Sequence, residues 1–78
     1  MKNIKVLGSG CSKCKTTINH INDRAVALGV EVELEKIEDI QDIIRYGVMS
    51  TPGVVLDGTV VHTGGVPSNA LIDEWLQQ

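Results

Sequence analysis

Strand-like and helix-like segments alternate along this chain, and their order constrains the fold more than any other feature. Residues 3–7 are typical of a short strand. From Cys14 to Leu28, apolar side chains recur at spacings of three and four, which predicts a helix that ends at Gly29. Residues 30–35 then alternate strictly between apolar and acidic side chains, which predicts a strand with one buried side. Its glutamates suit the edge of a sheet, where like charges discourage further pairing.

The next part of the chain predicts a short helix followed by a hairpin. Asp39 can cap this helix and Gly47 can end it. Its inner face is expected to hold Ile40, Ile43 and Ile44. Residues 54–56 and 60–62 resemble strands, and the Asp-Gly pair at 57–58 between them suits the positive φ angles of a tight turn.

A third helix is expected to begin at Pro67 and Ser68. Its inward-facing side chains are expected to be Leu71, Ile72, Trp75 and Leu76. The resulting order is βαβαββα, in which a right-handed crossover makes the first two strands parallel and the hairpin adds two antiparallel strands. We therefore expect one α/β domain over residues 1–78, with a mixed four-stranded sheet and helices on both of its faces.

Composition excludes several classes of partner. Seven basic and ten acidic side chains give a formal charge of −3, and Trp75 and Tyr46 are the only aromatic residues. Nucleic acid is not expected as a partner, because phosphate binding needs clustered cations and base stacking needs aromatic side chains. The sequence has no apolar run near the roughly 18 residues needed to cross a bilayer, so no membrane association is expected. The apolar stretch within residues 1–7 is too short for a secretory signal, which favours a cytoplasmic location.

Two cysteines, Cys11 and Cys14, are the only ones in the chain. A disulfide across this short loop would add only about 2 kcal/mol to stability in the chain-entropy model. The pair is therefore better explained by its chemistry. Cys11 would lie at a helix N-terminus, where unpaired backbone N–H groups favour the thiolate. Lys13 adds a positive charge and Ser12 a hydrogen-bond donor, so we expect a lowered pKa for Cys11.

The surroundings of the two thiols are expected to differ. Gly8 and Gly10 would leave the Cys11 sulfur open to a bulky substrate. Cys14 lies one helical turn later, on the apolar face with Ile18, and burial disfavours its thiolate. Cys11 is thus predicted to attack a disulfide, and Cys14 to resolve the mixed disulfide that forms.

Several motifs together are similar to those of a known family. They are GSGCSKC at residues 8–14, MSTPG at 49–53, the Asp-Gly turn at 57–58 and GGVPS at 64–68. The chain resembles thioredoxin-like proteins of glutaredoxin size, in particular the small prokaryotic redox-active disulfide proteins. Gly10 stands where thioredoxins proper carry an aromatic residue, and Lys5 is the only charged candidate where they hold a buried acid.

The resemblance implies a thiol–disulfide oxidoreductase without a cofactor. Its substrates would be protein or small-molecule disulfides, and a reductase or low-molecular-weight thiol would reduce it again. The catalytic residues would be Cys11 and Cys14. The resemblance also implies a cis peptide bond between Thr51 and Pro52, which would present the Thr51 backbone to an extended substrate segment. The other residues expected to contact substrate are Gly10, Ser12 and Lys13.

Two alternatives use the same cysteine pair. In a soft-metal carrier of the copper type, both thiolates would bind the cation. Such domains have the order βαββαβ and usually a methionine where this chain has Ser9. In a redox-responsive binding module, the disulfide state would alter a partner interface. No resident metal site is expected, because a zinc site would need His20 and His62 to converge with both cysteines.

Overall fold

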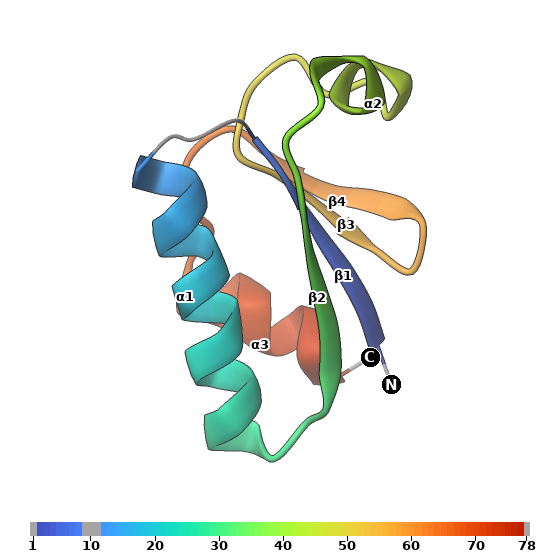
Figure 1. Cartoon of the computed structure of the whole chain (residues 1–78). Coiled ribbons are helices and arrows are strands. Elements are labelled where there is room, and N and C mark those ends of the chain that lie inside the picture. Colours follow the sequence, from blue (N-terminus) through green and yellow to red (C-terminus); the bar gives the residue numbers. More distant parts are fainter. Residues whose placement is uncertain (1, 9–11, 78) are drawn as a thin grey trace.

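The computed structural model describes residues 2–8 and 12–77. Along the chain these residues form β1 (Lys2–Leu7), α1 (Ser12–Leu28), β2 (Val32–Ile37), α2 (Ile40–Arg45), β3 (Gly53–Leu56), β4 (Thr59–Thr63) and α3 (Asn69–Gln77) (Figure 1). This order confirms the predicted alternation of strands and helices. None of the helices in the described ranges is long and apolar enough to cross a membrane.

The sheet has the strand order β2-β1-β3-β4 and is mixed, as predicted. β1 pairs with β2 in parallel and with β3 in antiparallel orientation, and β3 pairs with β4 in antiparallel orientation. Leu7, the last residue of β1, therefore lies opposite Gly53, the first residue of β3. This register brings the chain leaving β1 beside the chain entering β3.

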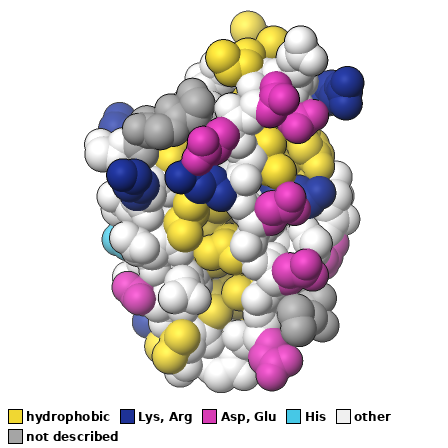
Figure 2. Space-filling model, viewed as in Figure 1, with side chains coloured by type: hydrophobic (Ala, Val, Ile, Leu, Met, Phe, Trp, Pro, Cys, Tyr) yellow, Lys and Arg dark blue, Asp and Glu magenta, His cyan; other side chains and the backbone are white. Residues whose placement is uncertain are grey.

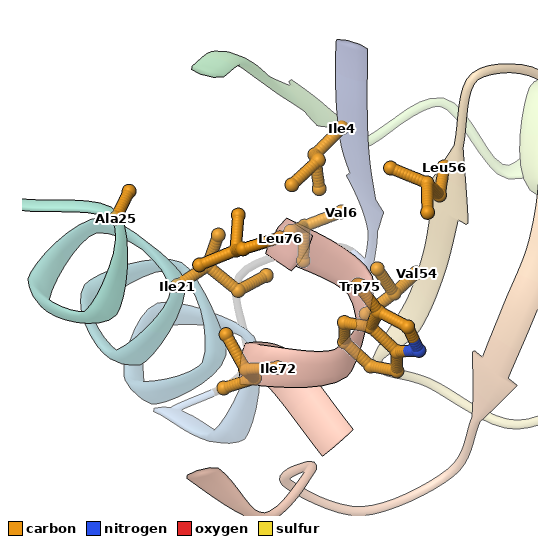
Figure 3. Packing of buried hydrophobic residues seen from close by; sticks show 9 residues of the cluster. All are labelled: Ile4, Val6, Ile21, Ala25, Val54, Leu56, Ile72, Trp75 and Leu76. Carbon is orange, nitrogen blue, oxygen red and sulfur yellow. The ribbon is translucent and has the colours of Figure 1, made fainter. Parts of the chain in front are cut away.

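Helices cover both faces of the sheet, and each face has its own core. α1 and α3 pack on one face, where the buried residues are Ile4, Val6, Ile21, Ala25, Val54, Leu56, Ile72, Trp75 and Leu76 (Figure 3). α2 lies on the other face, over a smaller cluster of Leu7, Ile43, Val48 and Val55 (Figure 1). Alternate residues of β1 and β3 thus point into different cores, as the pleat of a strand requires.

A partly exposed ion pair joins the two helices of the larger layer. Arg24 of α1 donates two hydrogen bonds to the Asp73 carboxylate of α3, at 2.7 and 2.8 Å. The hydrogen bond and the negative charge of Asp73 raise the pKa of Arg24 above its usual value. This two-point contact links α1 to α3.

The predicted turn and cap residues are confirmed. Gly29 ends α1 with a φ of 67°, and the hairpin turn has φ values of 49° at Asp57 and 87° at Gly58. The Asp39 side chain accepts a hydrogen bond from the Gln41 amide, so it caps α2. These positions were predictable because their conformation depends on the local sequence.

The strand after Gly29 begins later than predicted. β2 spans Val32–Ile37, whereas the alternating pattern placed it at residues 30–35. The Val30 amide donates to the Ala25 carbonyl at 2.9 Å and so closes the end of α1 instead of joining the sheet. β2 does lie at an edge, and acidic side chains are spaced along it (Figure 2).

Three expected core residues lie at the surface instead. Ile40 and Ile44 of α2 are 64% and 66% exposed, and Leu71 of α3 is 38% exposed. α2 is only six residues long and reaches the core through Ile43. Ile40 and Ile44 are one turn apart, so they share a side of the helix that turns away from the sheet.

Alanine substitutions in α2 should separate these roles. Ile43→Ala removes a buried side chain and should lower the free energy of unfolding by about 2–5 kcal/mol. Ile44→Ala, the matched control one residue later, should change it by about 0.5 kcal/mol or less. Urea unfolding of both variants provides the comparison. Equal losses would contradict the placement of α2.

Candidate active site

Cys14 is the third residue of α1 and is held in a closed environment. Its side chain is 1% exposed, in agreement with the burial predicted for it. Cys14 is disulfide-bonded in this structure. The chain contains one other cysteine, Cys11, and both Cys11 and Gly10 lie outside the described residues.

The backbone of Gly8 packs directly against the Cys14 sulfur. A Cβ atom added to Gly8 would overlap Cys14 Sγ, and it would lie 3.4 Å from Cys14 Cβ and 3.5 Å from Thr51 Cβ. The Gly8 amide donates to the Ile37 carbonyl at 2.9 Å, which extends the pairing of β1 and β2 by one residue. Gly8 thus lets three segments meet: the end of β1, the first turn of α1 and the segment before β3.

This role of Gly8 was not predicted; the expectation was only that Gly8 leaves the Cys11 sulfur open to a substrate. The available signal was its position directly after Leu7, the last residue of a buried strand. A glycine there is needed when another chain segment approaches the backbone closely.

Thr51, the residue before Pro52, lies on the same side of Gly8 as Cys14, because a Cβ atom added to Gly8 would approach both side chains. The peptide bond between Thr51 and Pro52 is cis. Thr51 is exposed and Pro52 is buried. The Pro52 carbonyl accepts a hydrogen bond of 2.9 Å from the Gly64 amide. The segment is thereby tied to the chain that follows β4, and it presents Thr51 at the surface beside Cys14.

Ser12 and Lys13 are exposed at the start of α1. Their carbonyl groups accept hydrogen bonds from the hydroxyls of Thr16, at 3.0 Å, and Thr17, at 2.8 Å. Thr17 is fully buried, and sequence reasoning did not single it out. Its hydroxyl pairs with the preceding turn, so the helix carries a satisfied polar group into the core next to Cys14.

Comparison with known proteins assigns the fold and the family. A family model described as the thioredoxin domain matches residues 2–77. The chain belongs to the thioredoxin domain family. It is 35% identical over 74 residues to a thioredoxin of Methanocaldococcus jannaschii, covering 95% of this chain and 85% of that protein. It is 30% identical over 76 residues to a thioredoxin of Methanothermobacter thermautotrophicus, covering 97% and 99%.

Solved thioredoxin structures share the fold. Mitochondrial thioredoxin 3 of Saccharomyces cerevisiae, in its oxidized form, superposes with a TM-score of 0.70 at 17% identity, over 97% of this chain and 76% of that one. A mutant thioredoxin of Halobacterium salinarum superposes with a TM-score of 0.73 at 18% identity, over 97% and 72%. The family model and the two thioredoxin relatives identify the protein as a thiol–disulfide oxidoreductase.

In this thioredoxin-like fold, Lys5 lies on the face of the sheet that α2 covers. Lys5 Nζ donates to the Tyr46 hydroxyl at 3.4 Å and lies 4.0 Å from a carboxylate oxygen of Glu35, its register partner on β2. The hydrogen bond with Tyr46 raises the pKa of Lys5, and the negative charge of Glu35 adds to the effect. Lys5, the only charged candidate for the position where thioredoxins proper hold a buried acid, is therefore a paired ammonium group.

The two histidines belong to different parts of the fold. His20 lies on α1 and lines a surface cavity with Asp23, Arg24, Ala27 and Asn69. It is half-buried, and within the described residues its Nδ1 is buried without a hydrogen-bond partner. His62 lies on β4 and contacts Gly65 and Trp75. Over residues 2–8 and 12–77, no group of three or more His, Cys, Asp or Glu side chains is placed to hold a metal ion.

Gly8→Ala should disturb the site directly. The added methyl group crowds Cys14 Sγ, so the variant should lose about 1–3 kcal/mol of unfolding free energy. The disulfide fixes the position of this sulfur more tightly than the thiol does. The substitution should therefore shift the equilibrium with glutathione toward the dithiol, which mass spectrometry of quenched samples measures.

The control for this experiment is Ile43→Ala, which loses packing on the opposite face of the sheet. It should be destabilised without a change in its equilibrium with glutathione. A Gly8→Ala variant with the redox equilibrium of the unsubstituted protein would show that Gly8 does not support the sulfur.

Proposed function

We propose that this oxidoreductase cycles between a dithiol and a disulfide of Cys11 and Cys14, with Cys11 as the nucleophile and Cys14 as the resolving thiol. The observation that carries the proposal is the position of Cys14. It is buried and disulfide-bonded on the first turn of α1, and it packs against Gly8 beside the exposed Thr51. A shielded thiol suits resolution, because it reacts with a neighbouring sulfur more readily than with solvent-borne disulfides.

The proposed exchange proceeds in two steps. The Cys11 thiolate attacks one sulfur of a substrate disulfide, which forms a mixed disulfide and releases the first substrate thiolate. Cys14 then loses its proton and attacks the Cys11 sulfur, which releases the second substrate thiolate. The substrate gains two electrons and, after protonation, two protons. The chain is left with the Cys11–Cys14 disulfide.

We assign substrate selection to the residues near the cysteine pair, beginning with Thr51. Thr51 is exposed, while the adjoining Pro52 is buried and its carbonyl is already bonded to Gly64. The Thr51 backbone is therefore the part of this segment available to an extended substrate chain, which would pair with it as an added strand. Gly10, Ser12 and Lys13 are proposed to contact the substrate as well.

The proposed cycle needs a source of electrons. A disulfide reductase or a low-molecular-weight thiol would reduce the Cys11–Cys14 disulfide after each turnover, and protein or small-molecule disulfides would be the substrates. Either electron donor suits the cytoplasm, where reducing partners keep thiols reduced. We propose that location for the protein.

Reduction of insulin disulfides, with dithiothreitol as the electron donor, tests the assignment. Cys11→Ala should abolish turnover, because the attacking sulfur is removed. Cys14→Ala should retain the first step and accumulate a mixed disulfide through Cys11, since the resolving thiol is missing. Mass spectrometry identifies the trapped adduct.

Two results would contradict the proposal. One is full activity of Cys11→Ala. The other is stoichiometric binding of copper(I) by the unsubstituted protein with no turnover of any disulfide, which would favour a soft-metal carrier. Ser68→Ala is a suitable control, because Ser68 caps α3 by accepting a hydrogen bond from the Leu71 amide and lies outside the proposed site.

A further inference from the structure

The turn after β4 forms hydrogen bonds on two sides, to Pro52 and to His62. Its residues Gly64 and Gly65 have φ values of 72° and 70°, which favour glycine. On one side, the Gly64 amide donates to the Pro52 carbonyl at 2.9 Å. On the same side, a Cβ atom at Gly64 would lie 3.4 Å from Ser50 Cβ, so the turn packs closely on the segment before β3.

On the other side, His62 holds the turn. Its Nε2 lies 3.1 Å from the Gly65 carbonyl oxygen. A carbonyl oxygen only accepts hydrogen bonds, so Nε2 must carry the hydrogen in this contact. The imidazole thus donates to Gly65, and the preceding residue, Gly64, donates to Pro52.

The His62 ring is itself anchored in the core. Its centroid lies 5.9 Å from that of Trp75, with the ring planes at 53°, a common geometry for aromatic pairs. Trp75 is 4% exposed and belongs to the larger core, where Figure 3 shows it near Val54. Val54 is also the register partner of His62. Contacts therefore run without interruption from the core to the Gly64–Gly65 turn.

We infer that His62 is a positioning residue for protein substrates. Its side chain fixes the Gly64–Gly65 turn, and this turn holds the Thr51–Pro52 segment in place. This inference rests on the proposed function, in which the Thr51 backbone pairs with an extended substrate chain. Loss of the imidazole would let the turn move and would weaken that pairing. A small disulfide does not need the backbone of Thr51, so its reduction should not depend on His62.

The test compares two substrates in the full-length protein. His62→Leu keeps a side chain that can pack on Trp75 but removes the donor. It should raise the KM for insulin roughly three- to tenfold, the range expected for one lost hydrogen bond. Its kcat for insulin and its rate with 5,5′-dithiobis(2-nitrobenzoate) should stay unchanged. His62→Gln, whose amide can still donate to the Gly65 carbonyl, should restore the low KM.

A second variant and a direct readout secure the result. His62→Asn has an amide too short to reach Gly65 and should raise KM as His62→Leu does. In both variants, hydrogen exchange at the Gly64 amide should accelerate, while exchange at the Val54 amide should not. His20→Gln is the control for replacing a histidine elsewhere, with KM and exchange at Gly64 unchanged.

The outcomes separate this inference from the proposed function. An unsubstituted protein that reduces neither substrate would contradict the proposed function. An active protein whose His62→Leu and His62→Asn variants keep the original KM would overturn only the role of His62. Equal losses with both substrates would also overturn it, since they would indicate a general structural defect.

Discussion

The absence of a side chain at Gly8 is the constraint on which the site depends. A methyl group there would occupy the space of Cys14 Sγ and press toward Thr51. Gly8 directly follows β1, which lies inside the sheet between β2 and β3. The Cys14 sulfur therefore packs on backbone that the sheet holds in place. Close-packed backbone of this kind leaves little room for adjustment. The shielding of Cys14 follows from it.

Sheet topology explains why distant parts of the sequence meet at this point. β1 and β3 are antiparallel neighbours, so the exit from β1 and the entrance to β3 lie at the same end of the sheet. β4 returns to that end, and its Thr63 pairs with Gly53. The turn after β4 can therefore bond to Pro52. The proposed site combines a helix start with two loops, all attached to strands that the larger core holds in place.

The element order and the local stop signals could be predicted because they depend on neighbouring residues, as at Gly29 and in the 57–58 turn. The burial of Cys14 was predictable from the same helical pattern. Contacts between distant residues were not. Periodicity could not show that Ile44 faces away from the sheet, since that depends on how a six-residue helix is seated. The link from His62 to Gly65 has no sequence signature at all.

The central claim is that one thiol of the pair is reactive and the other is shielded by its packing on Gly8. Competition for limiting iodoacetamide, with the fully reduced protein at neutral pH, measures this difference at each cysteine by peptide mass spectrometry. Cys11 should be alkylated at least about tenfold faster than Cys14, because alkylation requires an accessible thiolate. Equal rates at the two cysteines, or faster reaction at Cys14, would contradict the claim.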